Sequence, residues 1–306
     1  MLRAIFIALS ESTMIRRTAE RSSMGRRMSG RFVAGMTVAD ALDATARMNG
    51  LGMSATVDNL GENVTNREEA AESAKLYHEM IDALSSRGLN ANVSLKLTHM
   101  GLDVDEAMCR SIVADLVSHA ARVGSFVRID MEGSRYTQKT LEIVRALHRM
   151  PGNAGHVGAV IQSYLRRSEQ DVRELCEEGI RIRLCKGAYK EPADIAFQAK
   201  SEVDESFLRL TRTMLASGVF HGIATHDPAM IDGTKAFAQE RSIDPGSFEF
   251  QMLYGVRRDL QEQLVRDGWG MRVYIPFGTE WYPYFMRRLA ERPANVLFIA
   301  KNLFRR

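Results

Sequence analysis

The sequence lacks the features that mark disulfide-rich, membrane-spanning and strongly charged proteins. Only three of its 306 residues are cysteines, Cys109, Cys176 and Cys185, and none belongs to a CxxC pair. A disulfide framework and a cysteine-rich metal site are therefore not expected, and a reducing cytoplasm is the simplest setting. No apolar run approaches the ~18–20 residues of a membrane span. The formal net charge of +3 calls for no nucleic-acid partner.

Three catalytic signatures are also missing. The stretch "LGMSATVDNLGE" (51–62) holds no GxGxxG, so a nicotinamide-binding Rossmann fold lacks its fingerprint. No GxSxG elbow points to a serine hydrolase. No HxH or HExxH spacing offers a cation site. A metal-dependent barrel hydrolase stays the alternative enzyme class, and it would have to recruit His226, Asp227 and Asp130, because His221 is expected at the other end of its strand.

What the sequence does contain, from about residue 50, is a regular alternation of short apolar runs with longer amphipathic stretches. Helical patterns cover 66–88, 103–124 and 199–218, and several end in glycine, as helix C-termini prefer. The eight apolar runs are "MSATVD" (53–58), "NANVSLKL" (90–97), "FVRIDM" (126–131), "VGAVIQ" (157–162), "IRIRLCK" (180–186), "VFHGIAT" (219–225), "SFEFQML" (247–253) and "GMRVYIP" (270–276). This alternation predicts an α/β fold with parallel strands, and eight units over ~250 residues match a (βα)8 barrel of the TIM type.

The first part of the chain is unusually basic. Residues 1–31 carry seven arginines against Glu11 and Glu20 alone. We interpret residues 1–50 as a helical N-terminal extension and residues 51–306 as the barrel catalytic domain. The basic arm is interpreted as a cover helix, with a membrane-surface contact and an organelle-targeting segment as the open alternatives. A binding protein that uses this arm, with the barrel as a scaffold, is the hypothesis outside the enzyme class.

Active sites of such barrels form at the C-terminal ends of the strands and in the loops that follow. Lys96 ends one run and is expected to point into this mouth, with Asp130 across one strand. Two interpretations stay open: the pair neutralises itself at the rim, or Lys96 belongs to an anion pocket whose cations Asp130 orders. The strand-end residues are Asp58, Lys96, Asp130, Met131, Gln162, Arg183 to Tyr189, Thr225, His226, Leu253 and Tyr274.

Two strand-end stretches have a chemistry of their own. In "RLCKGAYK" (183–190), Gly187 and the small residue beside it would let a flat or phosphorylated ligand approach the backbone, although an ordinary turn with a stray lysine is the simpler interpretation. In "IATHDP" (223–228), His226 is expected to hydrogen-bond a cofactor rather than to bind a metal.

The C-terminal stretch "WYPYFMRRLAE" (281–291) places two adjacent arginines among aromatic and aliphatic residues. In a helix, Tyr284, Arg287, Arg288 and Glu291 would share one face. This helix would follow the eighth apolar run directly, so its first turns are expected at the same mouth of the barrel. A guanidinium fork can hold a carboxylate or a phosphate, and a glutamate one turn on can order the fork. A solvated charged face is the alternative.

Eight of these stretches, taken together, resemble the flavin-dependent proline dehydrogenase family over residues 50 to 300. They occur in the same order on successive predicted strands and read "VSLKL", "RIDMEG", "IQSYLRR", "RLCKGAY", "ATHDP", "FEFQMLYG", "YIPFG" and "YFMRRLAE". The resemblance implies a stand-alone bacterial enzyme with a distorted (βα)8 barrel. It also implies FAD across the mouth of the barrel and the oxidation of L-proline to Δ1-pyrroline-5-carboxylate by hydride transfer to flavin N5, the first step of proline catabolism to glutamate.

The resemblance also implies a role for each matching residue. Lys96, Arg287 and Arg288 would bind the proline carboxylate, and Glu291 would orient Arg288. The ring of proline would lie against Tyr189, Leu253, Tyr274 and Tyr284. Asp130 and Arg183 would be the catalytic residues, with Arg183 near the reactive nitrogen of the flavin. The flavin contacts would be Met131, Gln162, Arg183, Lys186, Gly187, Ala188, Tyr189, Lys200, Thr225 and His226.

Partners and location are implied in the same way. Electrons would pass from FAD to a membrane quinone, which gives the basic arm a role at the bilayer. The expected location is the cytoplasm, with peripheral contact at the inner face of the membrane, and the product would be handed to a pyrroline-5-carboxylate dehydrogenase. Lys190 departs from relatives that carry an aromatic residue after "KGAY", which leaves contacts to the outer part of FAD open.

Overall fold

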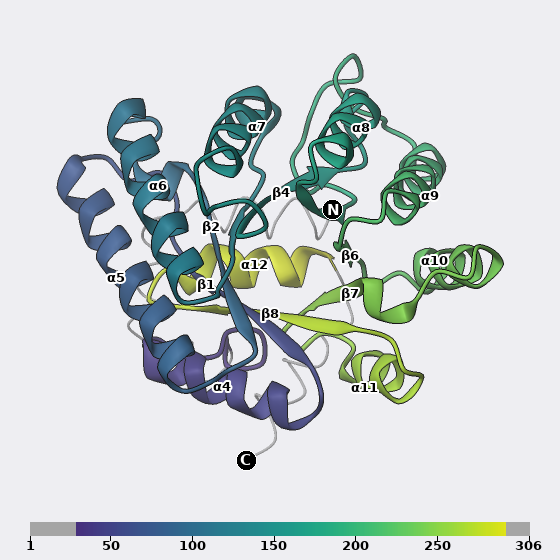
Figure 1. Cartoon of the computed structure of the whole chain (residues 1–306), viewed down its shortest axis with the longest axis horizontal. Coiled ribbons are helices and arrows are strands. Elements are labelled where there is room, and N and C mark those ends of the chain that lie inside the picture. The colour runs from purple at the N-terminus through teal and green to yellow at the C-terminus, as the bar shows by residue number, and fades with distance from the viewer. Residues whose placement is uncertain (1–28, 292–306) are drawn as a thin grey trace.

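Eight parallel strands close into a barrel in the computed structural model, which describes residues 29–291 and, for Arg287 and residues 289–291, the backbone only. Each strand pairs with its neighbours in chain order, and β8 returns to β1 (Figure 1). The strands are β1 Ser54–Asn59, β2 Ala91–Leu95, β3 Val127–Ile129, β4 Val157–Gln162, β5 Arg181–Cys185, β6 His221–Ala224, β7 Phe248–Leu253 and β8 Met271–Phe277. All eight predicted strands are therefore confirmed.

Helices surround the barrel, and most of them follow a strand as predicted (Figure 1). They are α4 Val38–Gly50, α5 Arg67–Ser86, α6 Glu106–Arg122, α7 Ser134–His148, α8 Ser168–Glu177, α9 Lys200–Ala216, α10 Pro228–Glu240, α11 Arg258–Arg266 and α12 Trp281–Glu291, with short 3-10 helices η1 Thr98–Met100 and η2 Pro245–Ser247. Of these described helices, none is long and apolar enough to cross a membrane.

The last helix departs from a regular barrel. In Figure 1, α12 projects onto the middle of the ring instead of lying beside β8. Its residues Trp281 and Phe285 pack in one apolar cluster with Phe32, Val33 and Leu60. Because Leu60 follows the C-terminal end of β1, this cluster places the first turns of α12 at the mouth of the barrel, as the sequence predicted.

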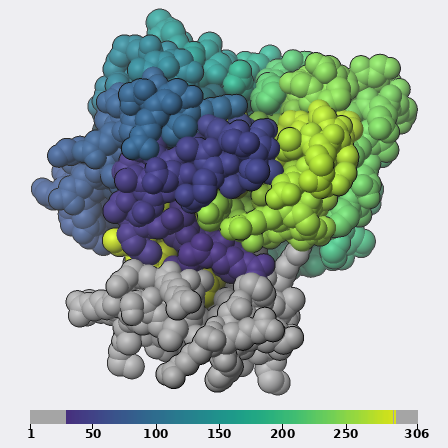
Figure 2. All heavy atoms as spheres, turned by 90° about the horizontal axis from the view of Figure 1, so that it is seen from below, coloured from purple at the N-terminus to yellow at the C-terminus, as the bar shows by residue number. Residues whose placement is uncertain are grey.

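Helix α4 lies outside β1 and β8, where a regular barrel would place α12. It packs against β1 and β8 and touches α5. Figure 2 shows the first described residues, in purple, between the blue α5 side and the yellow-green α11 side of the molecule. A capping box between Thr37 and Asp40 fixes where this helix begins. The division of the chain at residue 50 stays a prediction, although α4 ends there.

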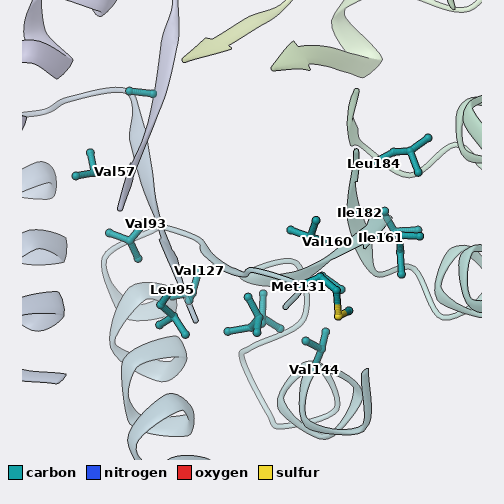
Figure 3. Close-up of a cluster of buried hydrophobic side chains, with 14 of the residues drawn as sticks. Val57, Val93, Leu95, Val127, Met131, Val144, Val160, Ile161, Ile182 and Leu184 are labelled. Atoms are coloured by element: carbon teal, nitrogen blue, oxygen red, sulfur yellow. The ribbon is translucent and has the colours of Figure 1, made fainter. Parts of the chain in front are cut away.

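The helix-facing side chains of the strands form the main hydrophobic core. Alternate residues of a strand point to opposite faces, so Val93 and Leu95 of β2 lie on the face that packs against helices (Figure 3). Met131, one residue beyond Asp130, belongs to this core and lies beside Val144 of α7 (Figure 3). Burial of this shell holds the strand ends in fixed positions.

The inside of the barrel is polar, whereas barrels of this type usually hold layers of branched apolar side chains. Arg183 of β5 donates hydrogen bonds to Thr56 of β1 and to Ser94 of β2, over 3.4 and 3.2 Å. Since β1 and β5 lie on opposite sides of the ring, these bonds cross the interior. Gly222 makes room for this network, because a Cβ there would lie 2.2 Å from Nε2 of Gln251.

Candidate active site

The centre of the mouth is an ion pair between Arg183 and Asp130. Nη1 of Arg183 lies 2.7 Å from Oδ1 of Asp130, and both side chains are largely buried. The same carboxylate accepts hydrogen bonds from the hydroxyls of Ser94, at 2.7 Å, and Tyr274, at 2.9 Å. Nε of Arg183 donates to Gln251 at 2.6 Å. The two predicted catalytic residues, Asp130 and Arg183, are thus brought together with Tyr274, which is one of the predicted substrate-binding residues.

Arg183 also stacks on an aromatic ring. Its guanidinium carbon lies 5.1 Å from the centre of the Tyr274 ring. A planar cation held by four acceptors and one aromatic face has little freedom to turn. Arg183 is therefore a fixed positive charge inside the mouth.

Lys96 forms an ion pair with Asp58. Its Nζ lies 3.7 Å from Oδ2 of Asp58, while Asp130 is bound to Arg183. Of the two open interpretations, the one in which Lys96 and Asp130 neutralise each other is wrong, because each pairs with another residue, and the anion pocket stays a prediction. Asp130 acts on Lys96 only through its charge.

The electrostatics keep Lys96 protonated. Burial alone would lower its pKa, but the charges of Asp58 and Asp130 outweigh burial and raise the pKa. Burial raises the pKa of Asp58, which Lys96 opposes. Asp58 was recognised as a strand-end residue but not as a member of the site. Its position as the last residue of "MSATVD", adjacent to the strand of Lys96, was the available signal.

The loop after β5 turns at Gly187, which has φ +114°. A Cβ at this position would lie 2.3 Å from the ring of Tyr164, so only glycine lets the loop pass this ring. Ala188 and Tyr189 follow at the surface, with Tyr189 41% exposed. The group that closely approaches the backbone of Gly187 is therefore the ring of Tyr164, within the protein itself.

The two lysines expected to contact the flavin have carboxylate partners. Lys186 pairs with Asp204 and, at 2.7 Å, with Asp227. Lys200, the first residue of α9, pairs with Asp204 and, at 3.6 Å, with Asp227. Sequence reasoning missed Asp204 and considered Asp227 only as a metal ligand, since nothing in their spacing places them beside "KGAY". Two lysines and two aspartates form a cluster without net charge.

His226 is neutral in this arrangement. Its Nε2 accepts a hydrogen bond from the backbone N–H of Leu253 at 3.0 Å, which requires a lone pair there and places the proton on Nδ1. Thr225 is buried, and its hydroxyl accepts from the backbone N–H of Asp227 at 3.1 Å.

Gln162, at the end of β4, ties the neighbouring loop to the barrel. Its Nε2 donates to the carbonyls of Met131 and Glu132, each at 3.3 Å. Its Oε1 is buried and has no hydrogen-bond partner among the described residues. A buried acceptor of this kind has a place for an N–H from a bound molecule.

The predicted face of α12 is described in part. Tyr284 is buried, and the guanidinium carbon of Arg288 lies 5.1 Å from the centre of its ring. This is the contact expected of residues four apart on a helix. The side chains of Arg287 and Glu291 lie outside what the structure describes, so their predicted roles stay predictions.

The chain is similar to known proteins over nearly its whole length. A family model described as proline dehydrogenase matches residues 41–301. Proline dehydrogenase 1 of Bacillus subtilis (strain 168) is 39% identical over 307 residues and is covered completely, as is this chain. The chain belongs to the proline dehydrogenase family. Proline dehydrogenase of Deinococcus radiodurans is 38% identical over 278 residues, which are 90% of this chain and 89% of that protein.

Membership of the family confirms the resemblance and the predicted class of enzyme, an oxidoreductase of proline metabolism. Among solved structures, proline utilization A (PutA) from Bdellovibrio bacteriovorus superposes with a TM-score of 0.84 at 24% identity. The match covers 95% of this chain and 36% of that protein, and it confirms the barrel fold.

Proposed function

We propose that this chain oxidises L-proline to Δ1-pyrroline-5-carboxylate with FAD as its redox cofactor, as the first step of proline catabolism. The observation that carries the proposal is the set of fixed charged groups at the mouth of a barrel that belongs to the proline dehydrogenase family. Different groups at the mouth would bind the carboxylate of proline, the ring of proline and the flavin.

The described residues fit a flavin in two respects. The unpartnered Oε1 of Gln162 can accept an N–H from the isoalloxazine, and the glycine turn at Gly187 leaves the backbone of the next residues open to a flat ring. When bound, the flavin would supply hydride acceptance at N5. The remaining proposed contacts are Met131, Arg183, Lys186, Ala188, Tyr189, Lys200, Thr225 and His226.

Three of these contacts would differ from a simple side-chain contact with the flavin. Met131 packs in the core, so its backbone carbonyl, held by Gln162, is the more accessible group. Lys186 and Lys200 each bind carboxylates, so an anionic phosphate would have to compete with Asp204 and Asp227 for their remaining N–H groups.

The substrate carboxylate would be held by Lys96, Arg287 and Arg288. Lys96 is suited to this because its raised pKa keeps the ammonium charged even though it is buried. Arg288, stacked on Tyr284, presents a guanidinium in a defined orientation, which Glu291 would help to fix. Anchoring one end of proline at two or three cations leaves its ring few orientations.

The ring of proline would lie against Tyr189, Leu253, Tyr274 and Tyr284. Tyr274 is held in place by its hydrogen bond to Asp130 and by the stacked Arg183. Arg183 would stabilise negative charge that develops on the cofactor, and Asp130 would keep that guanidinium in position. Neutral His226 would donate a hydrogen bond.

We further propose that electrons leave the protein to a membrane quinone. The protein would act in the cytoplasm, with peripheral contact at the inner face of the membrane, and would hand its product to a pyrroline-5-carboxylate dehydrogenase. The basic character of residues 1–31 supports the membrane contact. Residues 1–50 would form the extension and 51–306 the catalytic barrel.

The decisive experiment is optical. The purified protein should be yellow, with absorption near ~450 nm that bleaches when L-proline is added without oxygen. D-proline is the matched control, since it offers the same groups with the opposite arrangement at the reacting carbon. A colourless protein that cannot be loaded with FAD, or a flavin that L-proline leaves oxidised, would refute the proposal.

A further inference from the structure

The loop between β5 and α9 is fastened at both ends to the segment that follows β4. Near its start, the backbone N–H of Tyr164 donates to the carbonyl of Lys186 at 3.0 Å. Near its end, the N–H of Phe197 donates to the carbonyl of Tyr164 at 2.8 Å, and the N–H of Arg166 donates to Ile195 at 3.0 Å. These bonds fix where the loop leaves and re-enters the barrel wall.

In the middle of the loop, the side chain of Glu191 reaches the first residue of α7, and Nε of Arg166 donates to the carbonyl of Ala193 at 2.9 Å. Oε1 of Glu191 accepts from the backbone N–H of Ser134 at 2.7 Å, and its Oε2 accepts from the Ser134 hydroxyl at 2.6 Å. Both bonds are partly buried. The residue before the helix is Gly133, which has no side chain to cap it. A carboxylate 57 residues further along the chain therefore caps this helix, where its negative charge also favours the helix dipole.

This contact joins two segments that carry proposed cofactor contacts. Ser134 directly follows the segment that holds Asp130 and Met131, and Glu191 stands two residues after Tyr189. Gln162 ties the first of these segments to β4 through its bonds to the carbonyls of residues 131 and 132. The ends of β3, β4 and β5 are thus cross-linked by side chains around one space. Figure 1 shows the matching helices α7, α8 and α9 in succession along one side of the ring.

We propose that Glu191 is a positioning residue, which holds the backbone of residues 187–189 against the flavin by clamping its loop to the N-terminus of α7. The proposal rests on the proposed function, since it assumes that a flavin binds there. It assigns Glu191 no contact with cofactor or substrate. Its effect passes through the loop, in which Ala188 and Tyr189 are exposed.

The test compares Glu191→Ala and Glu191→Gln with the matched control Asp105→Ala. Asp105 caps α6 by accepting from the N–H of Met108 at 3.0 Å, so its loss also removes a helix cap, but it does not hold the loop after β5. Glu191→Gln keeps the shape and an acceptor oxygen, while Ser134→Ala removes one of the two bonds.

Two measurements decide the outcome. Amide hydrogen exchange of residues 187–191 in flavin-free protein should be at least ~10-fold faster in Glu191→Ala than in wild type or Asp105→Ala, because two charge-assisted hydrogen bonds are lost. The dissociation constant for FAD should rise by about 10-fold or more in Glu191→Ala, with partial recovery in Glu191→Gln. If Glu191 only stabilised the fold, Glu191→Ala would lower the melting temperature, as Asp105→Ala does. The exchange rate of residues 187–191 and the dissociation constant for FAD would then stay near wild type.

The outcomes separate the two proposals. Unchanged exchange of residues 187–191 in Glu191→Ala overturns the positioning role whether or not flavin binds. Faster exchange together with an unchanged FAD dissociation constant also overturns it. A wild-type protein that binds no FAD overturns the proposed function, and the exchange data then still report whether Glu191 orders the loop.

Discussion

Two buried histidines should make this protein sensitive to mild acid, and His221 is the better defined. It begins β6, is fully buried, and accepts a hydrogen bond at Nδ1 from the backbone N–H of Ile182 at 3.0 Å. The proton of the neutral ring is therefore on Nε2, which lies 3.1 Å from the Ser217 hydroxyl. Burial, and then the charges of Arg128 and Arg181, lower the pKa of His221 to about 3.

The magnitude follows from proton uptake by the unfolded chain. An unfolded histidine has a pKa of about 6.5, so between pH 7 and pH 5 the unfolded state binds nearly one proton that folded His221 does not bind. Because the folded pKa is the lower one, the stability is present above pH 6.5 and is lost as the pH falls toward 3. At pH 5 the free energy of unfolding should be lower by about 2 kcal/mol than at pH 7. His99, whose pKa is lowered to about 4 by burial and by Lys96, should add a similar loss.

The assay is urea unfolding at pH 7 and pH 5 at fixed ionic strength, for wild type, His221→Gln and the control His78→Gln. Glutamine can still accept from Ile182 but cannot be protonated in this range. His78 lies near the surface beside Asp115. The loss between the two pH values should shrink by about 2 kcal/mol in His221→Gln relative to both other proteins. An identical loss in all three would refute the reasoning, whatever the absolute stability of the variant.

Three further predictions concern the mouth of the barrel. Gly187→Ala should lower the free energy of unfolding by more than ~1 kcal/mol in urea, because φ is positive and the new Cβ would meet the ring of Tyr164; a silent change would contradict this. Asp130→Ala should cost about 3–5 kcal/mol in the same assay, because it leaves Arg183 buried without its carboxylate, and a cost below ~1 kcal/mol would show that the pair is not needed. Arg288→Lys should raise KM for proline by about 10-fold or more while FAD content stays the same, since the fork geometry is lost; unchanged affinity for proline would count against its role.

The pattern of apolar runs was enough to predict the strands, and each observed strand lies within two residues of its prediction. This works because the helix-facing residues of every strand must be apolar, and this requirement repeats eight times along the chain. The position of α12 at the mouth was also predictable, since "WYPYFMRRLAE" follows β8 directly and is rich in aromatic residues that need a buried partner.

The partners of the charged residues were not predictable in the same way. One of the two open interpretations paired Lys96 with Asp130, whereas in the barrel Lys96 pairs with Asp58 and Asp130 pairs with Arg183. Which carboxylate meets which cation depends on the stagger of the strands and on the directions of side chains inside the ring. Neither is recorded in the spacing of residues along the chain.

Sequence alone thus determined the repeating fold, the edge of the barrel where the polar groups gather, and the family to which those groups belong. Tertiary structure alone decided that α4 takes the place beside β1 and β8, that His226 is neutral, and that Glu191 caps a helix 57 residues earlier. The physical reason is the distance along the chain over which each interaction acts. Periodicity and capping act over a few residues and leave a local record, whereas an ion pair or a hydrogen bond between distant segments exists only once the barrel has closed.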